Sequence, residues 1–103
     1  MTTFVEIKNG SIYLTADVAD TYFKDIEAVI ILIRDSAIQV LPVNQMAAGG
    51  CFLKRLNSAG DRVASAPDVF VANDLGEYSN PAMEARWSSK DGALIIKLEN
   101  QQL

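Results

Sequence analysis

The stretch that decides the fold is AVIILIRDSAIQVL, Ala28–Leu41, in which two apolar runs meet at a short polar turn. Both runs are rich in β-branched residues, which favour strands, and Arg34-Asp35-Ser36 between them predicts a hairpin that Pro42 closes. Neither run shows the apolar–polar alternation of a strand with one face in water. We therefore expect both faces of this hairpin to be covered.

Three further hairpins are expected along the chain. They pair residues 4–8 with 11–14, 51–56 with 62–65, and 83–88 with 94–98. The first turn is Asn9-Gly10, a pair that suits a two-residue turn because both positions need a positive φ. The loop between residues 51–56 and 62–65 contains Gly60, which fits the left-handed position of a longer hairpin loop. The last hairpin alternates apolar and polar residues, which predicts one buried face and one wet face.

Two short helices complete the predicted elements. Thr15 is a good N-cap for a helix over about residues 16–23, and Asp17 favours the positive end of its dipole. Pro67 at a first helical position supports a second helix over about residues 67–73. The predicted fold class is therefore α+β, made mostly of antiparallel hairpins. We expect one domain over residues 1–103, in which 1–44 form a hairpin–helix–hairpin half and 50–99 form two further hairpins.

Composition excludes several classes of protein. The chain has 103 residues, a formal net charge of −4, one cysteine and no histidine. Without histidine there is no Ser-His or Cys-His pair, and a single cysteine cannot form an internal disulfide. An acidic balance gives no general attraction to nucleic acid or anionic membranes. The first ten residues lack a basic and apolar leader, so a cytoplasmic location is expected.

No catalytic, cofactor-binding or metal-binding residue is predicted, and we expect a protein that is not an enzyme. Three cations, Arg55, Arg62 and Arg86, are the candidate surface for a partner or an anion, together with the loop 74–81. If the first two lie across the third hairpin they could form an anion site, although surface arginines more often pair with acids. Trp87 alternates with core positions and is expected in the core.

A helix can cover one face of the central hairpin, and the other face needs either the C-terminal hairpins of the same chain or a second chain. We expect self-association, most simply as a homodimer. The residues chosen for this dimer surface are apolar positions of the two runs, Val29, Ile31, Ile33, Ile38 and Val40. The leading functional hypothesis is a small cytoplasmic binding module that acts as a homo-oligomer, with a possible protein partner. One alternative is a ligand-binding protein, or a histidine-free enzyme, with its site between protomers.

A second alternative comes from a resemblance. The order of a strand, Gly10, the strand ending in Leu14, a helix with Val18 and Tyr22, and the hairpin turning at Arg34-Asp35-Ser36 resembles the swapped-hairpin domain of the AbrB and MazE regulators. The resemblance covers residues 3–43 and has no match in the rest of the chain. It implies that two chains interleave, and that the protein is a transcriptional regulator or an antitoxin.

Overall fold

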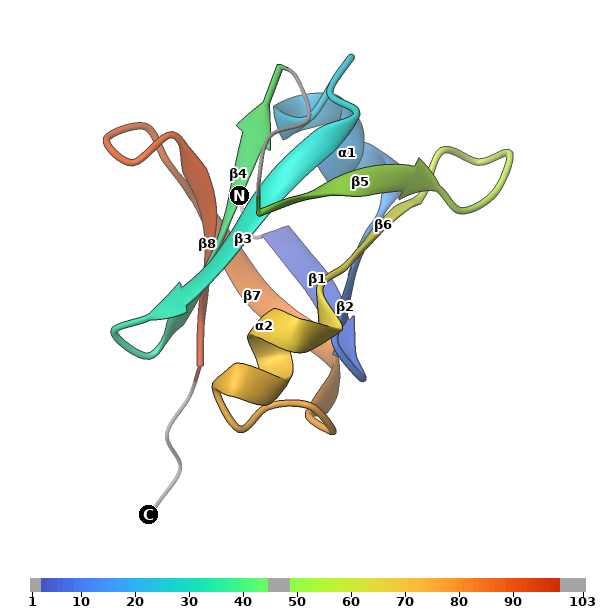
Figure 1. Cartoon of the computed structure of the whole chain (residues 1–103). Coiled ribbons are helices and arrows are strands. Elements are labelled where there is room, and N and C mark those ends of the chain that lie inside the picture. The colour runs from blue at the N-terminus through green and yellow to red at the C-terminus, as the bar shows by residue number, and fades with distance from the viewer. Residues whose placement is uncertain (1–2, 45–48, 99–103) are drawn as a thin grey trace.

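The computed structural model describes residues 3–44 and 49–98, which fold into a closed antiparallel barrel (Figure 1). The strands follow one another around the barrel in the order β1-β2-β6-β5-β3-β4-β8-β7, and β7 closes the barrel by pairing with β1. The elements are β1 (Thr3–Lys8), β2 (Ser11–Leu14), α1 (Ala16–Tyr22), β3 (Ala28–Arg34), β4 (Ala37–Val43), β5 (Gly50–Arg55), β6 (Arg62–Ser65), α2 (Pro67–Ala72), β7 (Ser79–Ser88) and β8 (Ala93–Lys97).

The predicted α+β class is wrong, because strands make up 53% and helices only 14% of the structure. Each of the four predicted hairpins does pair as expected, and both helices lie close to their predicted positions. Thr15 caps α1 by accepting a hydrogen bond from the Val18 N–H, and Pro67 begins α2. Neither helix in this part of the chain is long and apolar enough to cross a membrane. The predicted class was wrong because the four hairpins close into one barrel.

The barrel is built from one ββαββ unit used twice, β1-β2-α1-β3-β4 and β5-β6-α2-β7-β8. Exchanging the two units leaves the strand order around the barrel unchanged, so the fold has an approximate two-fold symmetry. The registers show which positions correspond. The Ile7–Ile12 pair of β1 and β2 corresponds to the Leu53–Ala64 pair of β5 and β6. The second hairpin of each unit corresponds as well. Next to the turn, the Arg34–Ala37 pair of β3 and β4 matches the Ser88–Ala93 pair of β7 and β8.

The hairpins of the two units alternate around the barrel. The β5–β6 hairpin lies between β2 and β3, and the β7–β8 hairpin lies between β4 and β1. Neither unit therefore forms a closed sheet by itself. The C-terminal half of the same chain supplies the two strands that flank the central hairpin, β5 beside β3 and β8 beside β4.

The core lies inside the barrel, and the two helices close its opposite ends (Figure 1). The two largest fully buried side chains are Phe23, the C-cap residue of α1, and Phe70 in α2, each 0% exposed. At the α1 end, Tyr22 stacks on Trp87 with ring centroids 5.1 Å apart, and Phe23 meets the same indole edge-on at 6.3 Å. Each end of the barrel thus has an aromatic plug that comes from a helix.

Candidate binding surfaces

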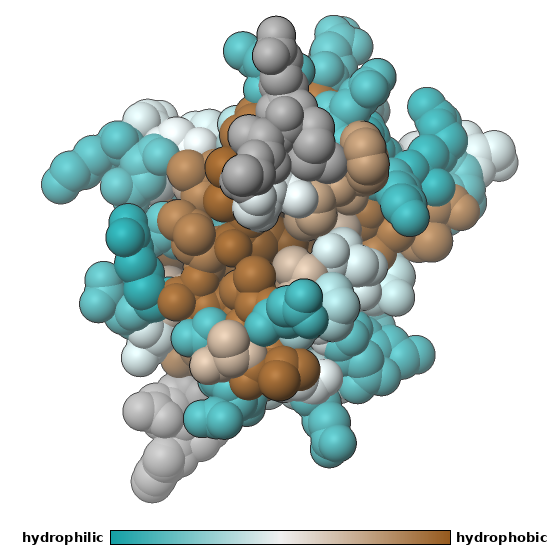
Figure 2. Space-filling view, in the orientation of Figure 1, coloured by the Kyte–Doolittle hydropathy of each residue, from teal (hydrophilic) through white to brown (hydrophobic). Residues whose placement is uncertain are grey.

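The outer face of the β3–β4 hairpin is an apolar surface that no other part of the described chain covers completely. Successive residues of a strand point to opposite faces, so burial of the odd-numbered positions in β3 places Ile30 and Leu32 outside. Leu32 is 36% exposed, and its cross-strand partner is Gln39. On the flanking strands, Phe52 of β5 is 58% exposed and Ile95 of β8 is partly exposed. Figure 2 shows apolar side chains gathered in the centre of this view.

We call this surface the apolar face and define it by outward-facing residues of four neighbouring strands. They are Ile30 and Leu32 of β3, Gln39 and Leu41 of β4, Phe52 of β5 and Ile95 of β8. Charged side chains border it at the turn end of the hairpin, where Arg34 is paired with Ala37 and Ala37 with Lys97. Both charged residues are exposed. The face is thus an apolar centre with a charged border.

The corresponding surface of the other half is charged. The two-fold relation matches the Leu32–Gln39 pair with Arg86–Ile95, and it matches Ile30 with Glu84. Position 41, a leucine, corresponds to Lys97 in the same way. These charged residues line a shallow hollow of about 280 Å³ on β7 and β8. The barrel therefore tolerates charge at these outward positions, and the apolar residues of β3 and β4 are not required by the fold.

The residues predicted as a dimer surface are corrected by the structure. Four of them, Val29, Ile31, Ile38 and Val40, are at most 3% exposed and lie inside the barrel. The fifth, Ile33, is partly buried against the same core. A second chain cannot reach the four buried residues while the barrel is closed. Only the neighbouring outward positions are available for contact.

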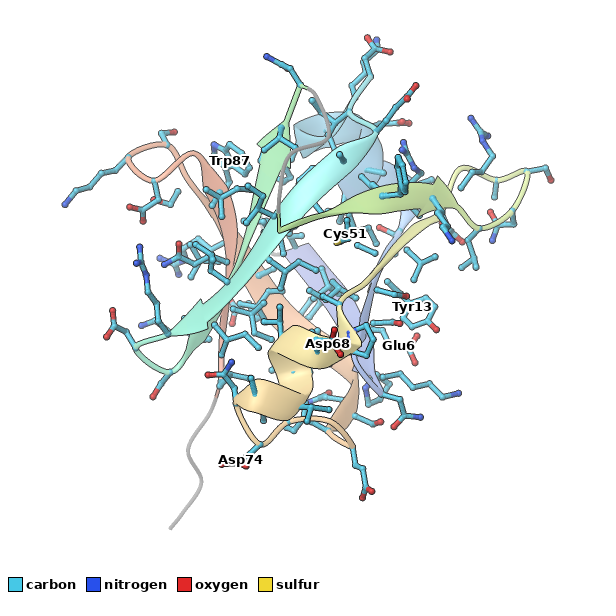
Figure 3. All side chains as sticks on the ribbon, viewed as in Figure 1. Glu6, Tyr13, Cys51, Asp68, Asp74 and Trp87 are labelled. Carbon is cyan, nitrogen blue, oxygen red and sulfur yellow. The ribbon has the colours of Figure 1, made fainter. Side chains whose placement is uncertain are left out.

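The three candidate arginines do not form one surface. Arg55 and Arg62 face each other across the β5–β6 hairpin, as the sequence suggested. Arg86 lies on β7 opposite Ile95, where it borders the hollow of the other half. The predicted loop 74–81 is also corrected, because β7 already begins at Ser79. Asp74, at the start of the shortened loop, lies beside α2 at the end of the barrel opposite α1 (Figure 3).

Arg55 and Arg62 line a crevice beside α1, which we call the arginine crevice. Its volume is about 580 Å³, and its lining includes Phe52 and Lys54 of β5. The opposite wall is formed by the end of α1 and the segment that leads into β3, and it contributes Asp20, Lys24, Asp25, Ile26 and Glu27. The sequence contains no direct signal for this crevice, because its two walls come from segments that are far apart along the chain.

Cys51 is not an activated thiol. It is half-buried on β5 and packs against the core (Figure 3). Burial raises the pKa of its thiol above the ordinary value of 9.0, so that the thiolate is scarce at neutral pH. Trp87 and Tyr78 are also partly buried against the core, as the alternation around Trp87 predicted.

In the described ranges, no group of three or more histidine, cysteine, aspartate or glutamate residues could hold a metal ion. Comparison with protein-family models, curated proteins and solved structures gives no match to this chain. The apolar face and the arginine crevice are surfaces of the barrel in which one half differs from the other.

Proposed function

We propose that this protein is a small, non-enzymatic binding module of the cytoplasm that acts as a homodimer through the apolar face. The observation that carries the proposal is the difference between the two halves of the barrel. Leucine stands at position 32 where the other half has Arg86, and isoleucine stands at position 30 where it has Glu84. Water-exposed apolar clusters of this kind mark interaction sites.

The size of the face suits a small dimer. Four strands spaced about 4.8 Å apart span about 19 Å, and the five residues of β3 from Ala28 to Leu32 span roughly 16 Å, which together give about 300 Å². Dimer interfaces are roughly 56–65% apolar, so this centre implies an interface of about 460–540 Å² per copy. The total of about 900–1,100 Å² is the size expected of a weak or transient complex.

A second copy of the chain is the occupant that fits the border of the face. A two-fold interface brings the same surface of both chains together, so the surface must complement itself. The border carries both signs of charge, with Arg34 and Asp35 at the hairpin turn and Glu84 and Arg86 beyond β8. A two-fold arrangement can therefore place each charge opposite one of the other sign.

Leu32→Glu is expected to convert the dimer into a monomer. The substitution places a carboxylate within the apolar face, where a dimer would remove it from water without a partner. Because the side chain points outward, the barrel itself keeps its core. Light scattering on a sizing column, over a dilution series, measures the mass of both proteins.

The matched control is Leu56→Glu, since Leu56 is also an exposed leucine, 49% exposed, and lies beyond the end of β5 away from the face. The control should keep the dimer mass. A wild-type protein that is monomeric throughout the dilution series contradicts the proposal. So does a Leu32→Glu protein that remains dimeric, because another surface must then hold the chains together.

The second candidate is a DNA-binding regulator of the AbrB and MazE type. The observation that favours it is the alternation of two ββαββ units around the barrel, which is the interleaving that the resemblance implied for two chains. Here both units belong to one chain. This candidate predicts retention on DNA that weakens as salt rises, with a further loss in Lys8→Glu, because DNA affinity depends on phosphate neutralisation. A lack of retention at low salt removes it.

A further inference from the structure

We propose that the arginine crevice binds a small anion, either a carboxylate or a phosphate, between the β5–β6 hairpin and the end of α1. The site shares only Phe52 with the apolar face, and all of its residues lie within one chain. Its cavity of about 580 Å³ falls in the usual range of roughly 300–1,000 Å³ for small-molecule sites.

The crevice exists because one hairpin is longer than its counterpart. The β1–β2 hairpin ends in the tight turn Asn9-Gly10, which packs directly against the start of α2. The β5–β6 hairpin continues past the corresponding point by the Arg55–Arg62 pair, and the Leu56 N–H then donates to the Asp61 carbonyl at 2.7 Å. The extension is therefore a feature of one half only, and it brings two arginines with it.

The extension is held in place against α1. The carboxylate of Asp61 accepts a hydrogen bond from the Ala16 N–H at 2.8 Å, and its other oxygen accepts one from the Asn57 side chain at 3.0 Å. Gly60 lies next to Ala16 as well. The wall that carries the arginines is thus fixed relative to the helix before any ligand arrives, which lowers the entropy cost of binding.

Arg62 is also fixed within the crevice. Its Nη2 atom donates to the carbonyl oxygens of Ile26 and Leu53 at 2.8 and 2.7 Å. Its Nε atom is buried and has no hydrogen-bond partner in the described part of the chain. A buried donor without a partner lowers stability, so the described fold leaves part of this guanidinium unsatisfied. The two carbonyls orient the guanidinium without neutralising its charge.

The second arginine explains why the ligand should be an anion. Arg55 stands directly opposite Arg62, and like charges in that position destabilise a pair of strands. Lys54 adds a third cation to the same wall. An oxyanion between the two guanidinium groups would remove this repulsion, and arginine is the side chain whose geometry best suits carboxylate and phosphate oxygens.

The opposite wall limits the kind of anion. Asp20, Asp25 and Glu27 line it and would repel a long polyanion such as a nucleic acid. Phe52 and Ile26 offer apolar contact beside the cations. The ligand is therefore a small molecule whose single anionic group meets the arginines and whose remainder is compact and partly apolar.

The test measures the melting temperature of the full chain with inorganic phosphate or benzoate, each at about 20 mM, against sodium chloride of equal ionic strength. A site of millimolar affinity would raise Tm by several degrees at this concentration. A rise with phosphate alone identifies a phosphate site, and a rise with benzoate alone identifies a carboxylate site. If neither anion raises Tm above the chloride reference, the proposal is overturned.

Arg55→Ala should abolish the rise while it leaves the two hydrogen bonds of Arg62 in place. Arg86→Ala, which removes an exposed arginine on a different strand, should retain the rise. A rise that survives in Arg55→Ala, or that disappears in Arg86→Ala, places the anion elsewhere and overturns the proposal. Repeating the measurement with Leu32→Glu separates the two proposals, because the anion site should persist whether or not the chain is a dimer.

Discussion

Phe70→Ala is expected to lower the free energy of unfolding by about 3–5 kcal/mol. The phenyl ring is 0% exposed and is one of the two largest fully buried side chains. Its removal leaves a cavity at the end of the barrel that α2 closes, and the closed sheet can relax only slightly to fill it. A domain of this size has a total stability of about 5–15 kcal/mol, so the loss is a large share.

Urea unfolding of the variant and the wild type measures the loss of free energy. In thermal unfolding, the Tm of the variant should fall by on the order of 10–20 °C. Phe4→Ala is the matched control, because Phe4 is the same residue type on a strand of the same barrel but is 51% exposed. Its cost should stay below about 1 kcal/mol. Equal losses in the two variants would mean that the Phe70 ring does not plug this end of the barrel.

Gly10→Ala is expected to cost about 2–5 kcal/mol, for two reasons that add. Gly10 has φ +85°, a left-handed conformation that costs other residues roughly 1–2 kcal/mol. An added Cβ would also lie 2.9 Å from Cα of Pro67 and 3.3 Å from its Cβ. Relief of that clash must move the first turn away from α2, and overpacking of this kind typically costs about 1–3 kcal/mol more.

Gly49→Ala separates the two contributions. Gly49 also has φ +85°, but a Cβ there would meet no atom of residues 3–44 or 49–98 within 4 Å. Its substitution should therefore show the conformational cost alone, about 1–2 kcal/mol. Urea unfolding of the two variants then gives the cost of the clash as their difference. If both alanine variants lose the same stability, the close packing of the Asn9-Gly10 turn on Pro67 is not a significant constraint.

The approximate two-fold symmetry of the barrel provides an internal reference for both binding surfaces. Each paired position that the two halves share has a counterpart in the other half under similar backbone constraints. Glu84 shows that the fold does not require an apolar residue at the position of Ile30. The tight turn at Gly10 shows that the fold does not require the hairpin extension that carries Arg55. The apolar residues at outward positions and the hairpin extension are therefore features that we attribute to binding and not to the needs of the fold.

The sequence by itself determined the local elements of this protein. Asn9-Gly10 defined a two-residue turn, and both residues have the positive φ that this turn needs. Thr15 and Pro67 marked the starts of the two helices. These signals were readable because each depends on the conformational preferences of a few adjacent residues, and tertiary contacts reinforced them.

Only the tertiary structure decided how the hairpins close and which face of the central hairpin is inside. The pairings of β2 with β6, β5 with β3, β4 with β8 and β7 with β1 join residues far apart in sequence, and no local pattern specifies them. Ile30 and Ile31 are the same residue type, so the sequence contains no sign of which one would face the core. Val29 and Ile31 are inside because the barrel closes on that side, and closure depends on strands contributed by both halves of the chain.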